Sequence, residues 1–312
     1  MTTHQPVHEA LHPRDVVLGR STHVSRILPH KVRRMVGAWC FLDLFGPDDI
    51  KTIGGMWVPP HPHTGLQTVT WLFEGLGRHT DSLGSDQLIR PGQLNVMTAG
   101  HGICHAEVSP EDAPRILHGV QLWVALPDPD RDTATPDFTH LEDLPTFSDA
   151  GAHVTVMVGE LAGRRSGAPT YSPLVAAEVR LSAGSHVVLP AVADFEYSVL
   201  AVGAPVMAGK GRVEPQVMAY LGAGGSELDL SAPEEDAIAL VLGGAPFEEE
   251  ILMWWNFIGR SHDEVVEQRA EWNGTGVDFE PSRYGAVRGF PGDRLLAPPM
   301  PTTRLRPRGR VA

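Results

Sequence analysis

Short runs in which apolar and polar residues alternate, separated by glycine or proline, dominate the chain. In residues 66–75, LQTVTWLFEG, the apolar side chains of Val69, Trp71 and Phe73 occupy alternate positions, and Gly75 ends the run. Alternation with a period of two is typical of a strand that buries one face. Similar runs recur at short intervals, and 33 glycines and 27 prolines supply the turns between them. The pattern predicts an all-β protein built as a barrel or a sandwich.

A change of composition after Pro127 separates two β-rich halves. The segment PDPDRDTATPDFTHLEDLPTF is rich in proline, aspartate and threonine, which is typical of a linker. Strand-like runs such as HVTVMVGEL and DAIALVLGGAPF then resume the rhythm of the first half. We therefore predict an N-terminal domain over residues 1–130, a linker over 131–145, a second domain over 146–275 and an extended tail over 276–312.

One helix is predicted near the end of the second domain. Ser261 is suited to the N-cap position, and Glu264 stands three residues later, as in a capping box. Val265 and Trp272 follow at helical spacing, and Gly274 supplies the stop. The sequence therefore adds one short C-terminal helix to the strands.

The charge balance is acidic, with a formal net charge of -13. An acidic surface repels phosphate, which argues against nucleic-acid binding through a broad basic face. Residues 283–310 depart from this balance, because they contain seven arginines and a single acid, Asp293. This tail either contacts an anionic partner, or it is a solvated terminal segment or a strap on an acidic body. The last two are favoured for so short a run.

The cysteines and the apolar segments bear on the compartment. Cys40 and Cys104 are too few for a disulfide framework, and the chain opens with a polar segment in place of an apolar signal sequence. No stretch of about 18 uncharged apolar residues occurs, so no membrane span is predicted. A cytoplasmic protein is therefore expected, and a bridge between the two cysteines is the alternative that the sequence leaves open.

Two pairs of ligand-type residues stand out, His61 with His63 and His105 with Glu107. Side chains two positions apart on a strand share one face. If the two strands are neighbours in a barrel, three imidazoles and one carboxylate converge, a set that suits a divalent transition metal better than Ca²⁺ or Mg²⁺. Pro62 fixes the chain between the first two histidines and so preorganises them. The competing interpretation is four unrelated residues in turns.

Two short motifs resemble those of the cupin superfamily, and longer stretches resemble the pirin family within it. The spacing Gly55-x5-His61-x-His63 looks like the first cupin motif, and Gly102-x2-His105 looks like part of the second. The stretches HPHTGLQTVTWLFEG, HTDSLG and PGQLNVMTAGHGICHAE are similar to pirins. This resemblance covers most of the predicted N-terminal domain and extends more loosely to GGAPFEEEILMWWNFIGRSHDEVVEQRAEW.

The resemblance implies an all-β bicupin, with two stacked β-barrel (jelly-roll) domains and a short C-terminal helix. It implies a monomer with one metal ion in the N-terminal barrel, at the positions of His61, His63, His105 and Glu107. That metal is usually iron, so Fe(II) is expected, while Ni, Cu, Co or Mn also suit these ligands. The C-terminal barrel is expected to lack a metal, because it has no His-x-His pair.

Two functions follow from the resemblance. Some pirin-like proteins open flavonols such as quercetin with dioxygen, which implies a quercetin 2,3-dioxygenase that acts on a small aromatic or flavonol-like substrate and O2. In such an enzyme Glu107 either only ligates the metal or also takes the proton of the flavonol 3-hydroxyl. The alternative is a non-enzymatic protein that responds to metal or redox state and acts through a protein partner.

Four further residues are expected near the predicted site, Gln67, His79, Asp81 and Cys104. Gln67 stands where many cupins carry a glutamate, so the carboxylate ligand is left to Glu107, and Gln67 is expected to hydrogen-bond a ligand or a bound water. His79 and Asp81 either line the pocket or form a hydrogen-bonded structural pair, and the pair is favoured. Cys104 is expected to point away from the metal as a small buried residue.

Overall fold

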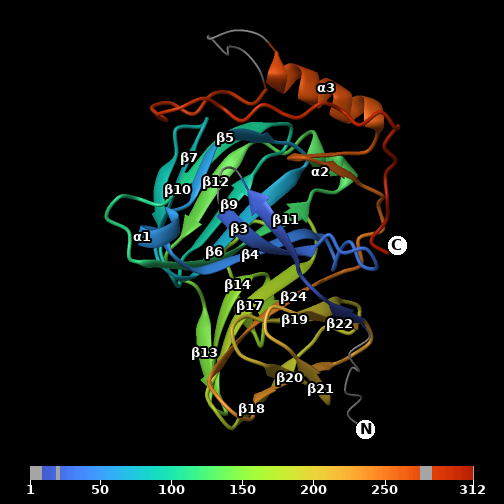
Figure 1. Cartoon of the computed structure of the whole chain (residues 1–312). Helices are drawn as coiled ribbons and strands as arrows, with labels where there is room; N and C mark the ends of the chain where they lie inside the picture. Colours follow the sequence, from blue (N-terminus) through green and yellow to red (C-terminus); the bar gives the residue numbers. More distant parts are fainter. Residues whose placement is uncertain (1–8, 19–21, 275–282, 312) are drawn as a thin grey trace. The chain divides into compact units, whose positions relative to one another are not determined.

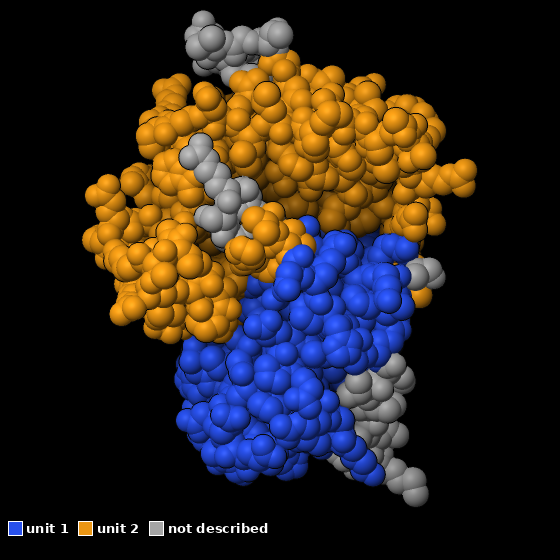
Figure 2. Space-filling view, in the orientation of Figure 1, with its two compact units in different colours: residues 1–15, 25–44, 141–247 blue, residues 16–24, 45–140, 248–312 orange. Residues whose placement is uncertain are grey.

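The computed structural model describes residues 9–18, 22–274 and 283–311, and most of its regular structure is strand (Figure 1). The chain forms two compact units, coloured separately in Figure 2. Unit 1 comprises residues 1–15, 25–44 and 141–247, and unit 2 comprises residues 16–24, 45–140 and 248–312. The all-β class with a short C-terminal helix is confirmed. The predicted boundaries cut the chain consecutively, whereas these units interleave along it.

Unit 1 contains a seven-stranded and a four-stranded antiparallel sheet. One apolar cluster takes residues from both, such as Val156 and Val241 from the larger sheet and Val187 and Leu230 from the smaller, so the two sheets pack face to face. In hydrogen-bonded order, the larger sheet consists of β1 (Glu9–Leu11), β22 (Met218–Gly222), β19 (Glu196–Ala201), β24 (Ala237–Gly244), β17 (Leu174–Leu181), β14 (Ala152–Val158) and β13 (Thr146–Asp149). The smaller sheet consists of β18 (Ser185–Pro190), β23 (Glu227–Ala232), β20 (Val206–Ala208) and β21 (Gly211–Val213), and β15 (Glu160–Leu161) pairs with β16 (Arg164–Arg165).

Unit 2 also has a larger and a smaller sheet, and it carries the predicted metal ligands on the smaller one. The smaller sheet consists of β5 (Trp57–His63), β10 (Ile103–Val108), β7 (Gly77–Asp81) and β8 (Asp86–Ile89). The larger sheet begins with β12 (Asp137–Leu141), β9 (Leu94–Thr98), β6 (Leu66–Glu74) and β11 (Ile116–Ala125). It continues through β4 (Trp39–Asp49), β3 (Thr22–Leu28) and β2 (Arg14–Leu18). Each of these three strands has some residues in unit 1 and some in unit 2.

Part of the segment that the composition assigns to a linker has regular structure. The short helix α2 (Asp128–Arg131) ends where the predicted linker begins, and β12 lies within it. β12 is the edge strand of the larger sheet of unit 2, next to β9. An edge strand needs only one hydrogen-bonded neighbour, so it tolerates proline- and aspartate-rich flanks. For this reason the composition of the segment does not predict the strand.

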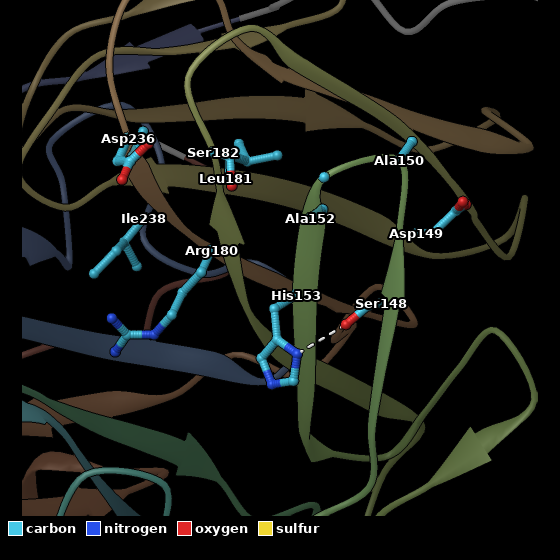
Figure 3. A pocket seen from close by; sticks show the side chains of 12 residues that line it. Ser148, Asp149, Ala150, Ala152, His153, Arg180, Leu181, Ser182, Asp236 and Ile238 are labelled. Carbon is cyan, nitrogen blue, oxygen red and sulfur yellow. Dashed lines mark hydrogen bonds between the residues drawn. The ribbon is translucent and has the colours of Figure 1, made fainter.

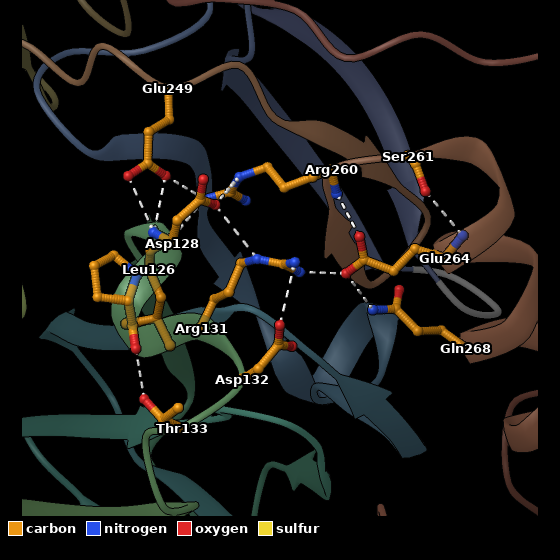
Figure 4. A network of polar contacts seen from close by, with 11 residues as sticks. Leu126, Asp128, Arg131, Asp132, Thr133, Glu249, Arg260, Ser261, Glu264 and Gln268 are labelled. Atoms are coloured by element: carbon orange, nitrogen blue, oxygen red, sulfur yellow. Dashed lines mark hydrogen bonds and ion pairs between the residues drawn. The ribbon is translucent and has the colours of Figure 1, made fainter.

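The C-terminal helix α3 (His262–Asn273) begins at the predicted cap (Figure 4). The Ser261 hydroxyl accepts a hydrogen bond from the Glu264 amide at 3.2 Å. The Glu264 carboxylate accepts from the Arg260 amide at 2.7 Å and also contacts Arg131 of α2 and Gln268 of the helix. The reciprocal half of the capping box is therefore replaced by a wider polar network within unit 2.

Residues 283–311, which we call the C-terminal strap, lie along unit 2 and are drawn from orange to red in Figure 1. The Leu295 amide donates to the Pro60 carbonyl on β5 at 2.9 Å. Arg283 and Arg304 form ion pairs with Glu271 and Asp263 of α3, at 2.7 and 2.6 Å. Of the two arrangements that the sequence favoured for the arginine-rich tail, the structure has the strap on acidic side chains.

The remaining elements are short. They are α1 (Ile50–Ile53) and the hairpin of β25 (Leu252–Trp254) and β26 (Phe257–Gly259) in unit 2. Cys40 and Cys104 are both buried, and neither forms a disulfide. None of the helices among the described residues is long and apolar enough to cross a bilayer.

Candidate metal centre

Three of the predicted ligands meet between β5 and β10. The two strands pair antiparallel, with His105 opposite His61 and Ile103 opposite His63. One ligand nitrogen from each of His61, His63 and His105 lies within 4.8 Å of the others. All three side chains are buried, with 6%, 1% and 1% of the residue exposed. The predicted convergence of the three histidines is therefore present, in a site closed to bulk water.

Backbone carbonyls orient two of the three rings. His61 Nδ1 lies 2.9 Å from the Pro59 carbonyl, and His63 Nδ1 lies 3.1 Å from the Asn256 carbonyl. A carbonyl only accepts, so each Nδ1 carries the proton and each Nε2 keeps its lone pair. Such hydrogen bonds from the far ring nitrogen are typical of metal-ligating histidines. The sequence offered no sign of Asn256, because its contribution is a backbone atom 193 positions away from His63.

The turn after β5 brings that carbonyl into place. Gly65 has a φ of 69°, and a Cβ added there would lie 2.3 Å from the Ile258 carbonyl oxygen. The Ile258 amide donates to the Thr64 carbonyl at 3.1 Å, which docks the β25–β26 hairpin against the end of β5. Only glycine permits both the left-handed backbone and this close approach. The glycine after the two histidines therefore helps to place Asn256 beside His63.

The donor set fits a transition metal ion. His63 Nε2 and His105 Nε2 lie 3.1 Å apart, and two nitrogens at about 2.1 Å from one ion and at right angles would be about 3.0 Å apart. Burial lowers the pKa of His61 to about 4, and burial first, then the neighbouring imidazoles, lowers the pKa of His63 and His105 well below the usual range. The imidazoles are thus neutral at pH 7, as metal ligation requires.

Glu107, the fourth predicted ligand, lies apart from the three histidines. The pairing of β10 with β5 shifts register between His105 and Glu107, so Glu107 stands opposite Val58. Its side chain lines a cavity of about 10 Å³ together with Thr70 and His79. Among the described residues, the group of possible ligands within 4.8 Å of one another contains the histidines and not Glu107. Burial raises the pKa of this carboxyl. Its ligation of the metal stays a prediction.

His79 and Asp81 on β7 form the predicted hydrogen-bonded pair, with His79 Nε2 lying 3.0 Å from Asp81 Oδ2. The other ring nitrogen, His79 Nδ1, lies 3.3 Å from His105 Nδ1. The His79 ring stacks on Phe138 of β12, with centroids 4.2 Å apart and planes 13° from parallel. The pair therefore lies behind the His105 ring, next to the nitrogen that points away from His63. The i,i+2 spacing of His79 and Asp81 was a usable signal of this role.

The other neighbours lie outside the ligand group. Gln67 is buried and donates to Thr98 Oγ1 at 3.0 Å. His101 is exposed in a turn. Cys104 points away from the histidines into a cluster with Trp272 and Tyr284, and burial raises its thiol pKa to about 12. The prediction that Cys104 is a buried, unreactive residue on the face away from the histidines agrees with this placement.

Unit 1 carries a different hollow, lined by β13, β14, β17 and the start of β24 (Figure 3). Its volume is about 670 Å³. His153 Nδ1 lies 3.1 Å from the Ser148 hydroxyl, and Arg180 pairs with Glu178 at 2.5 Å. Within the described ranges, the possible metal ligands group only in unit 2.

Two family models and a relative of known name match this chain. The family model described as Pirin matches residues 21–124, and the model described as Pirin C-terminal cupin domain matches residues 176–278. The "Putative quercetin 2,3-dioxygenase PA1205" of Pseudomonas aeruginosa is 43% identical over 298 residues, which are 96% of this chain and 92% of the relative.

Solved structures agree with that relationship. The crystal structure of quercetin 2,3-dioxygenase from Acinetobacter baumannii has a TM-score of 0.89 and 39% identity, and it covers 96% of this chain and 97% of its own. A bacterial pirin from Escherichia coli in complex with nickel(II) has a TM-score of 0.57 and 16% identity over 75% of this chain and 96% of its own, which shows a shared fold. The two-cupin architecture is thereby confirmed.

Proposed function

Because the chain belongs to the pirin family, we propose that it is a metal-dependent dioxygenase that cleaves flavonol-like substrates. The observation that carries this proposal is the group formed by His61, His63 and His105, whose ligand nitrogens lie within 4.8 Å of one another. The name of the 43%-identical relative and that of the Acinetobacter structure both support the quercetin 2,3-dioxygenase type.

We propose Fe(II) as the resident metal, held by the three histidines with Glu107 as the fourth ligand. Imidazole nitrogen also suits Ni, Cu, Co and Mn, so the fold and ligand set alone do not select iron. The nickel(II) complex of the Escherichia coli pirin is in line with this tolerance. A bound metal ion of this kind would supply a site where a deprotonated flavonol and dioxygen can react.

Glu107 is proposed to act as the base. A flavonol must lose its 3-hydroxyl proton before it can donate electron density, and a carboxylate within reach can accept that proton. Burial raises the pKa of Glu107 above that of an ordinary glutamate, which makes it a stronger base in its ionised form. Thr70 lies beside the carboxylate in the same cavity, and its hydroxyl donates to Gln121 Oε1 at 2.9 Å.

The closed site favours a second candidate, a regulatory protein that responds to metal or redox state. The three histidines are at most 6% exposed, and the cavity beside Glu107 measures about 10 Å³. Ligand pockets of drug size usually measure about 300 Å³ or more, so the space that the described residues leave beside Glu107 is too small for a flavonol unless a neighbouring element moves. A regulator that only senses the oxidation state of its metal needs no such opening.

Turnover assays test the enzymatic proposal. Metal-free protein is loaded with Fe(II) without oxygen and then given quercetin and O2, with substrate loss and carbon monoxide followed. We expect turnover that disappears in His63→Ala and persists in His101→Ala, whose imidazole is exposed in a turn. Loaded protein that consumes no quercetin would reject this substrate, and activity retained by His63→Ala would remove catalysis from this site.

The regulatory candidate makes a different prediction. If oxidation of the metal changes the surface of unit 2, hydrogen exchange of its amides will differ between the reduced and the oxidised loaded protein. Identical exchange in both states, together with quercetin turnover, would leave the enzyme as the supported function.

A further inference from the structure

We propose that Asp81 and His79 are positioning residues that set the tautomer of His105 and thereby direct its Nε2 lone pair into the metal site. The inference rests on the proposed metal centre, but it concerns hydrogen bonds that exist in the chain without any metal. The three histidine rings differ in their hydrogen-bond partners. His61 and His63 donate Nδ1–H to backbone carbonyls. Within the described residues, the ring nitrogens of His105 contact only other imidazoles.

The carboxylate of Asp81 is the fixed end of the chain of hydrogen bonds. Its side chain is fully buried. Its Oδ1 accepts from the Leu83 and Ser85 amides, both at 2.9 Å, so the turn after β7 holds it. Its Oδ2 faces His79 Nε2 at 3.0 Å. An ionised carboxylate only accepts, and therefore His79 Nε2 carries the proton of this bond.

That bond decides the state of the other nitrogen of His79. In a neutral imidazole with a protonated Nε2, Nδ1 is an acceptor. Its neighbour is His105 Nδ1 at 3.3 Å, which must then be the donor. Stacking on Phe138 at 4.2 Å holds the His79 ring in the plane that this contact requires. His79 thus does for His105 what the carbonyls of Pro59 and Asn256 do for His61 and His63.

The consequence reaches the metal-facing nitrogen. With the proton on Nδ1, His105 Nε2 presents a lone pair toward His63 Nε2, 3.1 Å away. A carboxylate behind a ligating histidine fixes its tautomer and raises its basicity, and here one imidazole relays that effect. Loss of such a partner usually weakens metal binding by about 10- to 100-fold.

Asp81→Asn is the direct test. The amide oxygen of that side chain can still accept from Leu83 and Ser85, but its NH2 group faces His79 Nε2 as a donor. His79 must then protonate Nδ1, and His105 must move its own proton to Nε2, in the wrong tautomer for a metal ligand. Asp86→Asn is the matched control, because Asp86 lies on neighbouring β8 and pairs with Arg78 on the exposed surface.

Two measurements test this proposal, the tautomer of His105 and the affinity for a metal ion. Nitrogen-15 NMR of metal-free protein is expected to show His105 protonated on Nδ1 in the wild type and in Asp86→Asn, and on Nε2 in Asp81→Asn. Competition with a chelator is expected to show Co(II) affinity reduced about 10- to 100-fold in Asp81→Asn alone. A folded Asp81→Asn with unchanged His105 tautomer or unchanged affinity overturns the proposal.

His79 variants keep the test decisive if Asp81→Asn fails to fold. His79→Asn offers an oxygen acceptor near the position of Nδ1, whereas His79→Leu offers none. We expect Co(II) affinity close to the wild type in the first and about 10- to 100-fold weaker in the second. Equal affinity of the two variants overturns the relay. A wild type that binds no Co(II) would instead reject the metal centre, while the NMR measurement would still decide the tautomer.

Discussion

At the scale of single residues, burial makes the histidines of the candidate centre ready for a metal. Their lowered pKa values mean that no proton has to leave the rings when an ion binds at neutral pH. Burial has a thermodynamic cost as well, because a histidine that is kept neutral in the native state can be protonated in the unfolded state. That cost is best measured at a histidine outside the ligand group.

His118 on β11 is such a residue, and burial lowers its pKa to about 4. Between the ordinary pKa of about 6.5 and this value, the unfolded chain binds a proton that the native protein does not. This proton uptake therefore leaves the free energy of unfolding unchanged above a pH of about 6.5 and lowers it as the pH falls toward about 4. For metal-free protein in urea, the loss between pH 7 and 5 should be about 2 kcal/mol smaller in His118→Gln than in the wild type.

The exposed residue His101 supplies the control for this measurement. His101→Gln should lose as much stability as the wild type between the two pH values, because its ring meets solvent in both states. If His118→Gln and His101→Gln behave alike, the lowered pKa of His118 is refuted.

At the scale of elements, the local sequence pattern predicted the features that depend on residues close in the chain. It missed the features that depend on residues far apart in the chain. The strand at residues 66–74, the cap at Ser261 and the shared face of His61 and His63 depend on spacing alone. The β12 strand depends on hydrogen bonds to β9, and its composition resembles a loop. The carbonyl of Asn256 and the contact of His79 with His105 depend on tertiary docking, which periodicity does not encode.

The start of α3 allows local and tertiary contributions to be compared. Ser261 contributes one capping hydrogen bond, whose loss in Ser261→Ala should cost about 1 kcal/mol. Glu264 accepts from the Arg260 amide and pairs with Arg131 (Figure 4). The Arg131 side chain is only 18% exposed. Glu264→Ala leaves these donors without that acceptor and should cost about 2 kcal/mol or more in urea unfolding. Equal costs would mean that Glu264 acts only as part of the cap.

At the scale of the whole molecule, two units with similar pairs of sheets differ in what fills them. The cluster between the sheets of unit 1 consists of apolar side chains such as Val154, Val199 and Leu228. Unit 2 instead places three imidazoles on its smaller sheet. Since an apolar core offers no lone pairs, the same architecture serves as a scaffold in one unit and as a candidate metal centre in the other.

This difference predicts about one metal ion per chain. The two histidines of β14 and β18 in unit 1, His153 and His186, are both exposed, and they contact Ser148 and Asp229 at the surface. Metal-free protein is loaded with excess Ni(II), desalted and analysed by mass spectrometry for metal. The wild type and the double variant His153→Ala/His186→Ala should each retain about one ion, and His105→Ala should retain almost none. Two ions in the wild type, or one ion in His105→Ala, would show that the chain binds metal elsewhere.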